Sequence, residues 1–218
     1  MNRIEPTEVA TLVIAKEPRP GLAKTRLAPA LGPVGSAALA EAALADTLEA
    51  VAGVDGRRVL VLEGQPGGWL PEGFEVIPQR GRGLDERLAS AFEDAGAPAF
   101  LVGMDTPQVT ADTIERGRTA LCADGIDAVL GEATDGGWWA IGIRNADRRV
   151  FDGVPMSLDT TGASQRRRLE ERGLRWEPLE VLNDVDTIED AREVARLAPH
   201  GRFAAELARL ERADRSPA

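Results

Sequence analysis

Short apolar runs alternate with helix-like segments along this chain, and this alternation limits the possible folds more than any other feature. Apolar runs typical of buried strands lie at 9–15, 57–63, 74–78 and 99–104. The intervening segments 33–52, 85–95 and 110–122 carry apolar residues at helical spacing. Strands that alternate with helices are typical of βαβ units. The sequence therefore predicts an α/β fold with a mostly parallel, doubly wound sheet over residues 9–130.

The strand-like runs after residue 130 are shorter and are interrupted by glycines. We expect strands at 127–130, 138–143 and 175–182, and helices at 163–172, 187–197 and 203–212. Strands of mixed direction and an acceptor pocket are expected in this half. No linker or repeat divides the 218 residues, so we predict a single domain.

A basic loop joins the first predicted strand to the first predicted helix. Its cations are Lys16, Arg19, Lys24 and Arg26, and Gly21 would let the backbone approach a ligand closely. Ligands of open α/β sheets collect at the carboxyl ends of the strands, where this loop is expected. The loop therefore indicates binding of an anionic, phosphorylated small molecule, and the alternative is an ordinary solvated loop. It contains neither a Walker-type nor a G-x-G-x-x-G phosphate-binding motif.

Carboxylates follow two of the apolar runs. Asp105 comes directly after the run 99–104, and the segment Asp184-Val185-Asp186 follows the run 179–182. Alternate side chains of a D-x-D segment can point the same way, so Asp184 and Asp186 could share one cation. Mg²⁺ binds to one or two carboxylates together with substrate phosphates, which suits these residues better than zinc does. The alternatives are helix capping for Asp186 and a turn for Asp184.

Two glycine-containing segments are further candidates. Thr134, Asp135, Gly136, Gly137 and Trp138 combine polar groups and a flexible backbone with an aromatic ring. In a strand, adjacent tryptophans point to opposite faces, so one of the pair 138–139 could line an acceptor pocket while the other joins the core. A tightly packed hairpin is the alternative.

The second segment contains Gly81 and Gly83 and ends at Leu84. It could let a nucleotide approach the backbone, or it could be a plain turn.

Composition excludes several functions. The net charge of −10 argues against binding to nucleic acid or to an anionic membrane surface. The single histidine, His200, argues against a Ser-His-Asp triad and rules out multi-histidine zinc sites. One cysteine, Cys122, fits a reducing compartment, and no segment resembles a signal peptide. We expect a cytoplasmic protein.

The assembled motifs resemble a bacterial family of GT-A-type glycosyltransferases, the arsenosugar-biosynthesis-like glycosyltransferases. That family is related to the phospholactate and molybdenum-cofactor guanylyltransferases. The resemblance spans about residues 11–197 and rests on four motifs: 16–21 with 24–27, 103–107, 135–142, and 184–187 with 189–190. The sequence departs from the family pattern at Gln108, at the tryptophan pair 138–139 and at Met156.

The resemblance implies a Rossmann-like GT-A fold that binds a nucleotide or nucleotide-sugar donor with Mg²⁺ or Mn²⁺. Residues 9–130 would form the nucleotide-binding part, 131–200 the acceptor and metal part, and 201–218 a C-terminal helix and tail. Lys24, Arg26 and Asp105 are then the implied catalytic residues.

The resemblance also implies a role for each remaining candidate residue. The implied nucleotide-binding residues are Lys16, Gly21, Lys24, Arg26, Gly81, Gly83 and Leu84. The implied metal ligands are Asp105, Asp184 and Asp186, and the implied acceptor-binding residues are Thr134, Asp135, Gly136, Gly137 and Trp138.

Three functions remain open from the sequence. The first is glycosyl transfer from a nucleotide-activated donor to a small-molecule acceptor. The second is nucleotidyl transfer to a small phosphorylated acceptor, and the third is a non-catalytic nucleotide-binding module. The sequence fits either a monomer or a homodimer.

Overall fold

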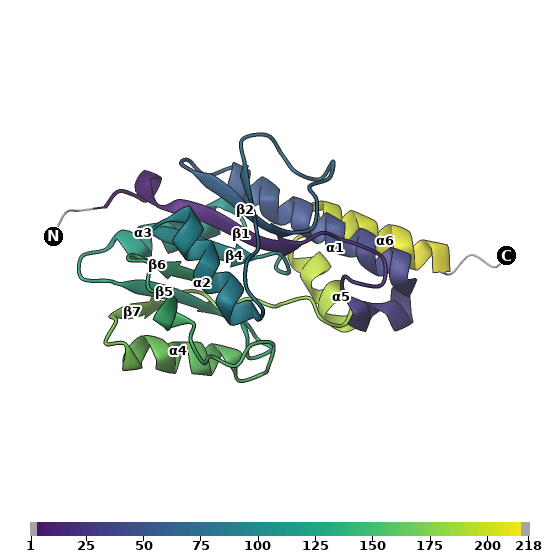
Figure 1. Cartoon of the computed structure of the whole chain (residues 1–218). Helices are drawn as coiled ribbons and strands as arrows, with labels where there is room; N and C mark the ends of the chain where they lie inside the picture. Colours follow the sequence, from purple (N-terminus) through teal and green to yellow (C-terminus); the bar gives the residue numbers. More distant parts are fainter. Residues whose placement is uncertain (1–3, 215–218) are drawn as a thin grey trace.

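The computed structural model describes residues 4–214, which form one sheet with helices on both faces (Figure 1). The sheet has seven strands in the order β3-β2-β1-β4-β6-β5-β7. Strand β6 pairs antiparallel with β4 and β5, and every other pairing in the sheet is parallel. The predicted mixed, mostly parallel α/β sheet is therefore confirmed, and β6 supplies the reversed direction expected in the second half.

The elements follow the predicted alternation. The strands are β1 (Ala10–Lys16), β2 (Arg58–Glu63), β3 (Glu75–Pro78), β4 (Ala99–Gly103), β5 (Ala128–Glu132), β6 (Trp138–Ile143) and β7 (Trp176–Pro178). The α-helices are α1 (Ala28–Ala52), α2 (Leu84–Ala95), α3 (Ala111–Cys122), α4 (Thr161–Glu171), α5 (Ile188–Leu197) and α6 (Arg202–Asp214). Short 3-10 turns are η1 (Pro6–Glu8), η2 (Thr25–Leu27) and η3 (Arg148–Val150).

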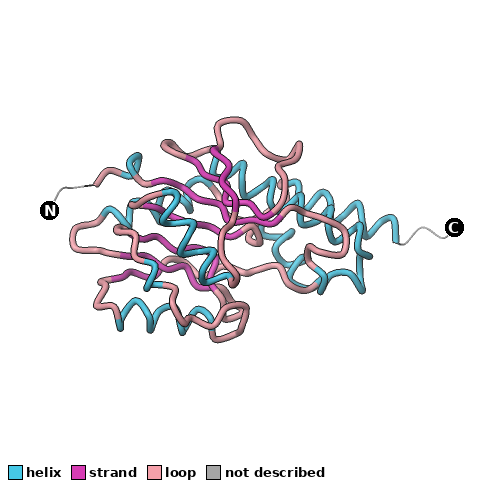
Figure 2. The backbone as a smooth tube through the Cα atoms, in the orientation of Figure 1, coloured by secondary structure: helices cyan, strands magenta, loops and turns pink. Residues whose placement is uncertain are grey.

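Two apolar cores lie on the opposite faces of the sheet. On one face α1 and α3 pack through residues such as Leu44 and Ile114, and on the other α2 and α4 pack through Phe92 and Leu169. Figure 2 shows the strands running between these helices. Inner strands such as β4 are buried along most of their length, as the continuous apolar runs predict.

Helices α5 and α6 extend the fold on the far side of α1. Phe203 and Leu207 of α6 join Val194 of α5 in a third apolar core against α1. The carboxylate of Asp46 in α1 accepts the backbone N–H groups of Arg202 and Phe203 at 2.9 and 2.8 Å. A side chain distant in sequence thus caps the start of α6 and fixes where this helix lies.

The kinked helical stretch Thr25–Ala52 is the one segment of the described residues that is long and apolar enough for a membrane span by length and composition. Its apolar residues pack inside the protein. Leu44 and Leu48 face the core beside the sheet, and Leu39 faces the core shared with α5 and α6. Packing on two sides accounts for its composition.

Two predicted elements differ from the structure by more than two residues at one end. The helix predicted at 33–52 begins earlier, at Ala28, and is kinked at Gly32, whose φ of 68° and ψ of 166° are not helical. The strand predicted at 175–182 is wrong in length, because β7 ends at Pro178 and only a bridge from Leu182 to Ala133 continues it. Strand β5 has an irregular register beside Gly131, and such bulges bend a strand away from regular pairing.

Candidate active site

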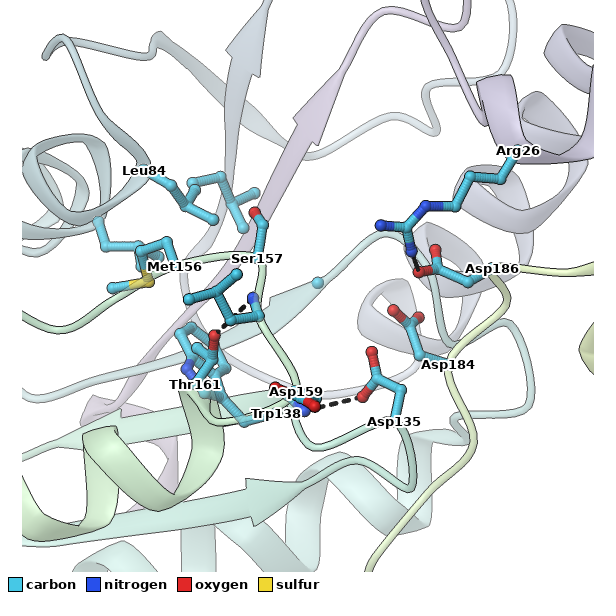
Figure 3. A pocket seen from close by; sticks show the side chains of 15 residues that line it. Arg26, Leu84, Asp135, Trp138, Met156, Ser157, Asp159, Thr161, Asp184 and Asp186 are labelled. Carbon is cyan, nitrogen blue, oxygen red and sulfur yellow. Dashed lines mark hydrogen bonds and ion pairs between the residues drawn. The ribbon is translucent and has the colours of Figure 1, made fainter.

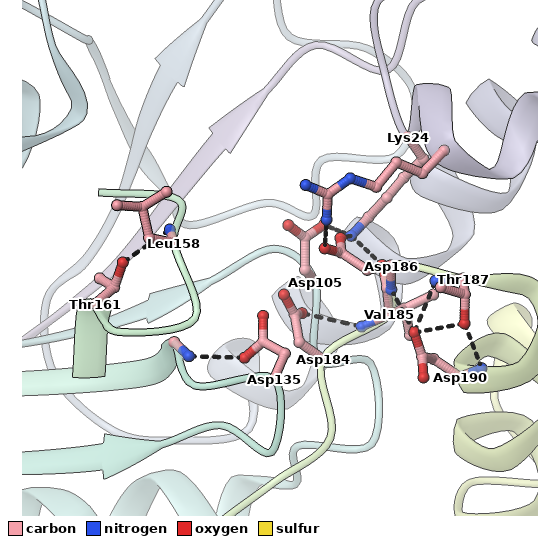
Figure 4. A network of polar contacts seen from close by, with 12 residues as sticks. Lys24, Asp105, Asp135, Leu158, Thr161, Asp184, Val185, Asp186, Thr187 and Asp190 are labelled. Carbon is pink, nitrogen blue, oxygen red and sulfur yellow. Dashed lines mark hydrogen bonds and ion pairs between the residues drawn. The ribbon is translucent and has the colours of Figure 1, made fainter. Parts of the chain in front are cut away.

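The charged side chains singled out by the sequence lie along one edge of the sheet, because every parallel strand ends on the same side. The loop after β1 carries Lys24 and Arg26, the segment after β4 carries Asp105, and the segment after β7 carries Asp184 and Asp186. Figures 3 and 4 show these side chains facing one another across this edge. Residues 160 positions apart in the sequence are therefore brought into direct contact.

Lys24 lies at the centre of this group. Its Nζ is 2.9 Å from Oδ1 of Asp105 and 3.5 Å from Oδ1 of Asp186, and it also donates to the backbone oxygen of Val185. Only 10% of the Lys24 side chain is exposed. The Lys24 backbone is left-handed, with φ of 45°, a conformation that costs a non-glycine residue energy. The three contacts of the ammonium compensate for this strain and hold the loop against the acids.

The acids around Lys24 control its charge. Burial alone would lower the pKa of the Lys24 ammonium, but the charges of Asp105 and Asp184 outweigh burial and raise this pKa above its ordinary value. Lys24 is therefore a permanent cation. Arg26 differs, since 70% of its side chain is exposed, and among residues 4–214 its ion pair is with Asp186.

Asp184 is the carboxyl group with the most unfavourable surroundings. Burial raises the pKa of Asp184 to about 7; Lys24 opposes this rise, whereas the charges of Asp105, Asp186 and Asp135 add to it. Its Oδ1 accepts the backbone N–H of Val185 at 3.0 Å. The negative charge of these four carboxylates therefore exceeds the positive charge of the cations beside them.

The backbone of residues 183–187 is held in place from both ends. The N–H of Val185 donates to the backbone oxygen of Asp105 at 3.2 Å. Thr187 and Asp190 form a capping box at the start of α5. Because Thr187 supplies this cap, Asp186 is not the cap residue and its carboxylate is free to pair with Lys24 and Arg26.

An open cavity of about 560 Å³ lies beside this polar group. Its polar lining consists of Arg26, Asp135, Ser157, Asp159, Thr161, Asp184 and Asp186, and its apolar lining of Ile14, Leu84, Leu88, Trp138, Met156 and Leu158, with Gly103 and Gly137. Figure 3 shows Arg26 and Asp186 at one side and Leu84 and Met156 at the other. Cavities of this size with a few convergent polar groups are typical of small-molecule sites.

The two adjacent tryptophans separate as strand geometry predicts. Trp138 lines the cavity on the face that α2 and α4 cover. Trp139 is 2% exposed on the other face, where its Nε1 donates to the backbone oxygen of Glu180 at 2.9 Å. This places Trp138 at the site and Trp139 in the core.

The segment 156–161 lines the cavity too. Apart from the departure at Met156, the sequence predicts no functional role for it. The N–H of Gly162 donates to the backbone oxygen of Gly136 at 2.8 Å. A Cβ at Gly136 would lie 1.9 Å from the backbone oxygen of Asp159. Gly136 is thus required for close contact between the two segments. The polar residues Ser157, Asp159 and Thr160 just before a predicted helix are the sequence signal that indicates such a segment.

Other candidate residues lie at the rim of the site or outside the cavity lining. Lys16 pairs with Glu63 at 3.3 Å, and Gly21 lies in an exposed part of the loop with no neighbour around the position of a Cβ. Thr134 donates from its hydroxyl to Oδ1 of Asn183 at 2.8 Å.

The turn before α2 contains the two glycines predicted to approach a nucleotide. A Cβ at Gly81 would lie 2.6 Å from the Cβ of Glu86, and a Cβ at Gly83 would lie 2.4 Å from Oδ1 of Asp85. The first turn of α2 therefore requires glycine at position 81, where φ is 131° and backbone atoms of α2 lie close, whereas at position 83 the Asp85 side chain could move aside. Of this segment, Leu84 reaches the cavity.

The carboxylates suit a divalent metal by their chemistry. Asp105, Asp184 and Asp186 offer the hard oxygen ligands that Mg²⁺ and Mn²⁺ bind, and their excess negative charge would favour a cation. Within residues 4–214, however, no three His, Cys, Asp or Glu side chains are grouped closely enough to form a ready-made metal centre. The ammonium of Lys24 lies among the oxygens of Asp105 and Asp186 instead.

The fold is that of the nucleotide-diphospho-sugar transferase class. A protein from Desulfovibrio desulfuricans G20 with the provisional name nucleotide-diphospho-sugar transferase is 26% identical, with a TM-score of 0.82 over 95% of this chain and 96% of that one. Residues 37–158 match the family described as "Uncharacterized protein conserved in bacteria (DUF2064)". The chain belongs to this family. A search of curated proteins gave no match.

More distant structures share the fold. CMP:2-keto-3-deoxy-manno-octonic acid synthetase, in a complex with CTP, is 12% identical with a TM-score of 0.57 over 88% of this chain and 98% of that one. The bifunctional IspDF of Campylobacter jejuni is 13% identical with a TM-score of 0.53, over 85% of this chain and 54% of that one. The structural neighbours are thus sugar-nucleotide transferases and nucleotidyltransferases.

Proposed function

We propose that this protein is a metal-dependent transferase that moves a glycosyl group from a nucleotide-activated donor to a small-molecule acceptor. The main support is the meeting of Lys24 and Arg26 with Asp105 and Asp186 beside a cavity of about 560 Å³. The similarity to the Desulfovibrio protein favours the same class of reaction. The finer relation to arsenosugar-type glycosyltransferases and to guanylyltransferases is part of this proposal.

Arg26 is the cation best placed to bind the donor phosphates. It is largely exposed, it lines the cavity, and a phosphate could take the place of its ion pair with Asp186. Lys24 stays among the carboxylates and lowers their mutual repulsion. Asp105 and Asp186, with Asp184, would hold Mg²⁺ or Mn²⁺, which when bound supplies positive charge to the donor diphosphate as it leaves.

The acceptor would react from the side of the cavity that Asp135 lines. Its hydroxyl oxygen forms a bond to the donor carbon while the bond from that carbon to the diphosphate oxygen breaks, and a nucleoside diphosphate leaves. The hydroxyl proton passes to a carboxylate. Asp135 is placed for this role, because its Oδ1 is oriented by the Gly137 N–H at 2.8 Å and it has no cation partner among the described residues.

Calorimetry with UTP, GTP and a panel of nucleotide sugars, with and without Mg²⁺, tests the proposal. We expect Asp105→Asn and Asp186→Asn each to abolish metal-dependent nucleotide binding while the circular dichroism spectrum stays unchanged. Asp124→Asn is the matched control, because Asp124 is exposed and lies outside the site. Unchanged nucleotide affinity in both site variants would rule out the metal assignment.

Product analysis separates the possible reactions. Release of a nucleoside diphosphate indicates glycosyl transfer, whereas release of pyrophosphate from a triphosphate indicates nucleotidyl transfer. Nucleotide binding without any product across the panel would instead support a non-catalytic binding module.

A further inference from the structure

On the basis of the proposed function, we infer that the acceptor carries no negative charge: it is a neutral or positively charged hydroxyl compound with an apolar face. Nucleotidyl transfer, the alternative reaction, would use a phosphorylated acceptor, so the charge of the acceptor distinguishes glycosyl transfer from nucleotidyl transfer. It follows from the charges, the backbone donors and the apolar side chains around the cavity.

The charged side chains that line the cavity are mostly negative. Among the described residues that line the cavity, Arg26 is the one cation, and the donor phosphates would use it. Four acids line the same cavity: Asp135, Asp159, Asp184 and Asp186. In the proposed function Asp184 and Asp186 hold the metal, so Asp135 and Asp159 are the carboxylates that face the acceptor. A second anionic group on the acceptor would find no cation of its own and would lie close to carboxylates, which is repulsive.

The first two backbone N–H groups of α4 are not available to an anion. Helix α4 begins at the cavity, and the start of a helix can bind a phosphate through free N–H groups. Here the first two of these groups are already used, since Thr161 N–H donates to Leu158 at 3.0 Å and Gly162 N–H donates to Gly136 at 2.8 Å. The segment 156–161 therefore closes this helix end instead of opening it to an anion.

The side chains nearest α4 favour an apolar face with hydroxyl groups. Trp138 and Met156 form an apolar surface on which the C–H face of a ring can pack. The carboxylate of Asp159 makes no hydrogen bond or ion pair with any of residues 4–214, and Asp135 uses one oxygen for Gly137. Carboxylate oxygens only accept hydrogen bonds, so hydroxyl or ammonium donors complement them.

A matched pair of small molecules tests the inference. Phenyl β-D-glucoside and its 6-phosphate share an apolar ring and hydroxyl groups and differ in charge. We would titrate each into the full-length protein and measure the dissociation constants by NMR at an ionic strength of about 20 mM, where charge effects are least screened. The neutral compound should bind at least about fivefold more tightly than the phosphate.

A charge-reversal variant links the selectivity to the site. Asp159→Lys should reduce or invert the preference for the neutral compound, whereas Asp124→Lys, with the same charge change on the exposed surface away from the cavity, should leave the ratio unchanged. Asp159 is exposed, so folding should tolerate the substitution. Circular dichroism of both variants checks this.

The outcomes separate this inference from the proposed function. Equal or tighter binding of the phosphate, binding of neither compound at millimolar concentration, or an unchanged ratio in Asp159→Lys would each overturn the inference. Nucleotide binding is measured by calorimetry on the same samples. If nucleotides bind while the phosphorylated compound is preferred, the inference fails alone; if no nucleotide binds, the proposed function fails as well.

Discussion

The Nζ atom of Lys24 lies 2.9 Å from Oδ1 of Asp105, and this contact joins the first loop of the chain to the end of the central strand β4. Lys24 is nearly buried there, whereas Arg26, two residues later, is largely exposed. The two cations therefore have different consequences when removed. We propose that Lys24 mainly stabilises the fold around the acids and that Arg26 mainly binds the ligand.

Lys24→Met should destabilise the protein. Without its ammonium, Asp105, Asp184 and Asp186 would repel one another in a partly buried position, and loss of one partner of a buried ion pair costs about 3–5 kcal/mol. Because these acids are partly exposed, we expect a value at the lower end of that range. Urea denaturation at pH 7 measures it, and adding Asp105→Asn to Lys24→Met should recover part of the loss.

Arg26→Met is the matched comparison. Its exposed ion pair should contribute less than about 1 kcal/mol to stability, but nucleotide affinity should fall at least about tenfold, since one charge-assisted phosphate contact is lost. Calorimetry and urea denaturation of the same variant measure both effects. A large loss of stability with unchanged nucleotide affinity would contradict this division of roles.

Gly136→Ala should distort the acceptor side of the cavity. The new Cβ would lie 1.9 Å from the backbone oxygen of Asp159, and φ at Gly136 is 87°. Gly173→Ala is the control, because Gly173 has φ of 68° and open space around the position of its Cβ. Backbone strain alone costs about 1–2 kcal/mol. The free energy of unfolding should therefore fall more in Gly136→Ala than in Gly173→Ala, and only Gly136→Ala should lose transfer activity. Equal losses of stability and activity in the two variants would show that the contact with Asp159 is not needed.

Asp46→Ala should loosen α6 from α1. The carboxylate of Asp46 accepts the N–H groups of Arg202 and Phe203, and loss of such a cap costs about 0.5–2 kcal/mol. Hydrogen exchange should accelerate first in residues 202–207. Glu170→Ala, at an exposed position of α4 on the other face of the sheet, should change neither measurement.

Asp147→Asn tests a pH-dependent contribution to stability. The hydrogen bond from the Arg149 side chain is the main factor that lowers the pKa of Asp147 below 3.8, and Arg172 adds to it. A lowered pKa in the folded state means that ionised Asp147 stabilises the protein above about pH 4 and that this contribution disappears as the pH falls through the folded pKa.

The variant should accordingly be less stable at pH 7 by up to about 1 kcal/mol, because the carboxylate is only partly exposed. The difference should shrink below pH 4. Urea denaturation between pH 3 and pH 7 measures it, and a constant difference across that range would disprove the linkage.

The positions of the inner strands could be predicted from the sequence, because a strand that is buried on both faces requires a continuous apolar segment. Residues 99–104 predict β4, and 138–143 coincide with β6. Thr110 accepts the N–H of Thr113 at 3.1 Å, as its predicted cap requires. The same local patterns could not give the end of β7 at Pro178, because that end depends on irregular pairing in β5, the neighbouring strand.

The sequence by itself determined the alternation of elements, the side of the sheet on which the charged segments lie, and the opposite orientation of Trp138 and Trp139, since these follow from local periodicity and from the shared direction of parallel strands. Only the tertiary structure decided that Lys24 is surrounded by acids while Arg26 faces the cavity, and that residues 156–161 close the start of α4. These contacts join segments far apart in the chain, and their distances depend on strand order, β6 reversal and helix packing, which no local pattern specifies.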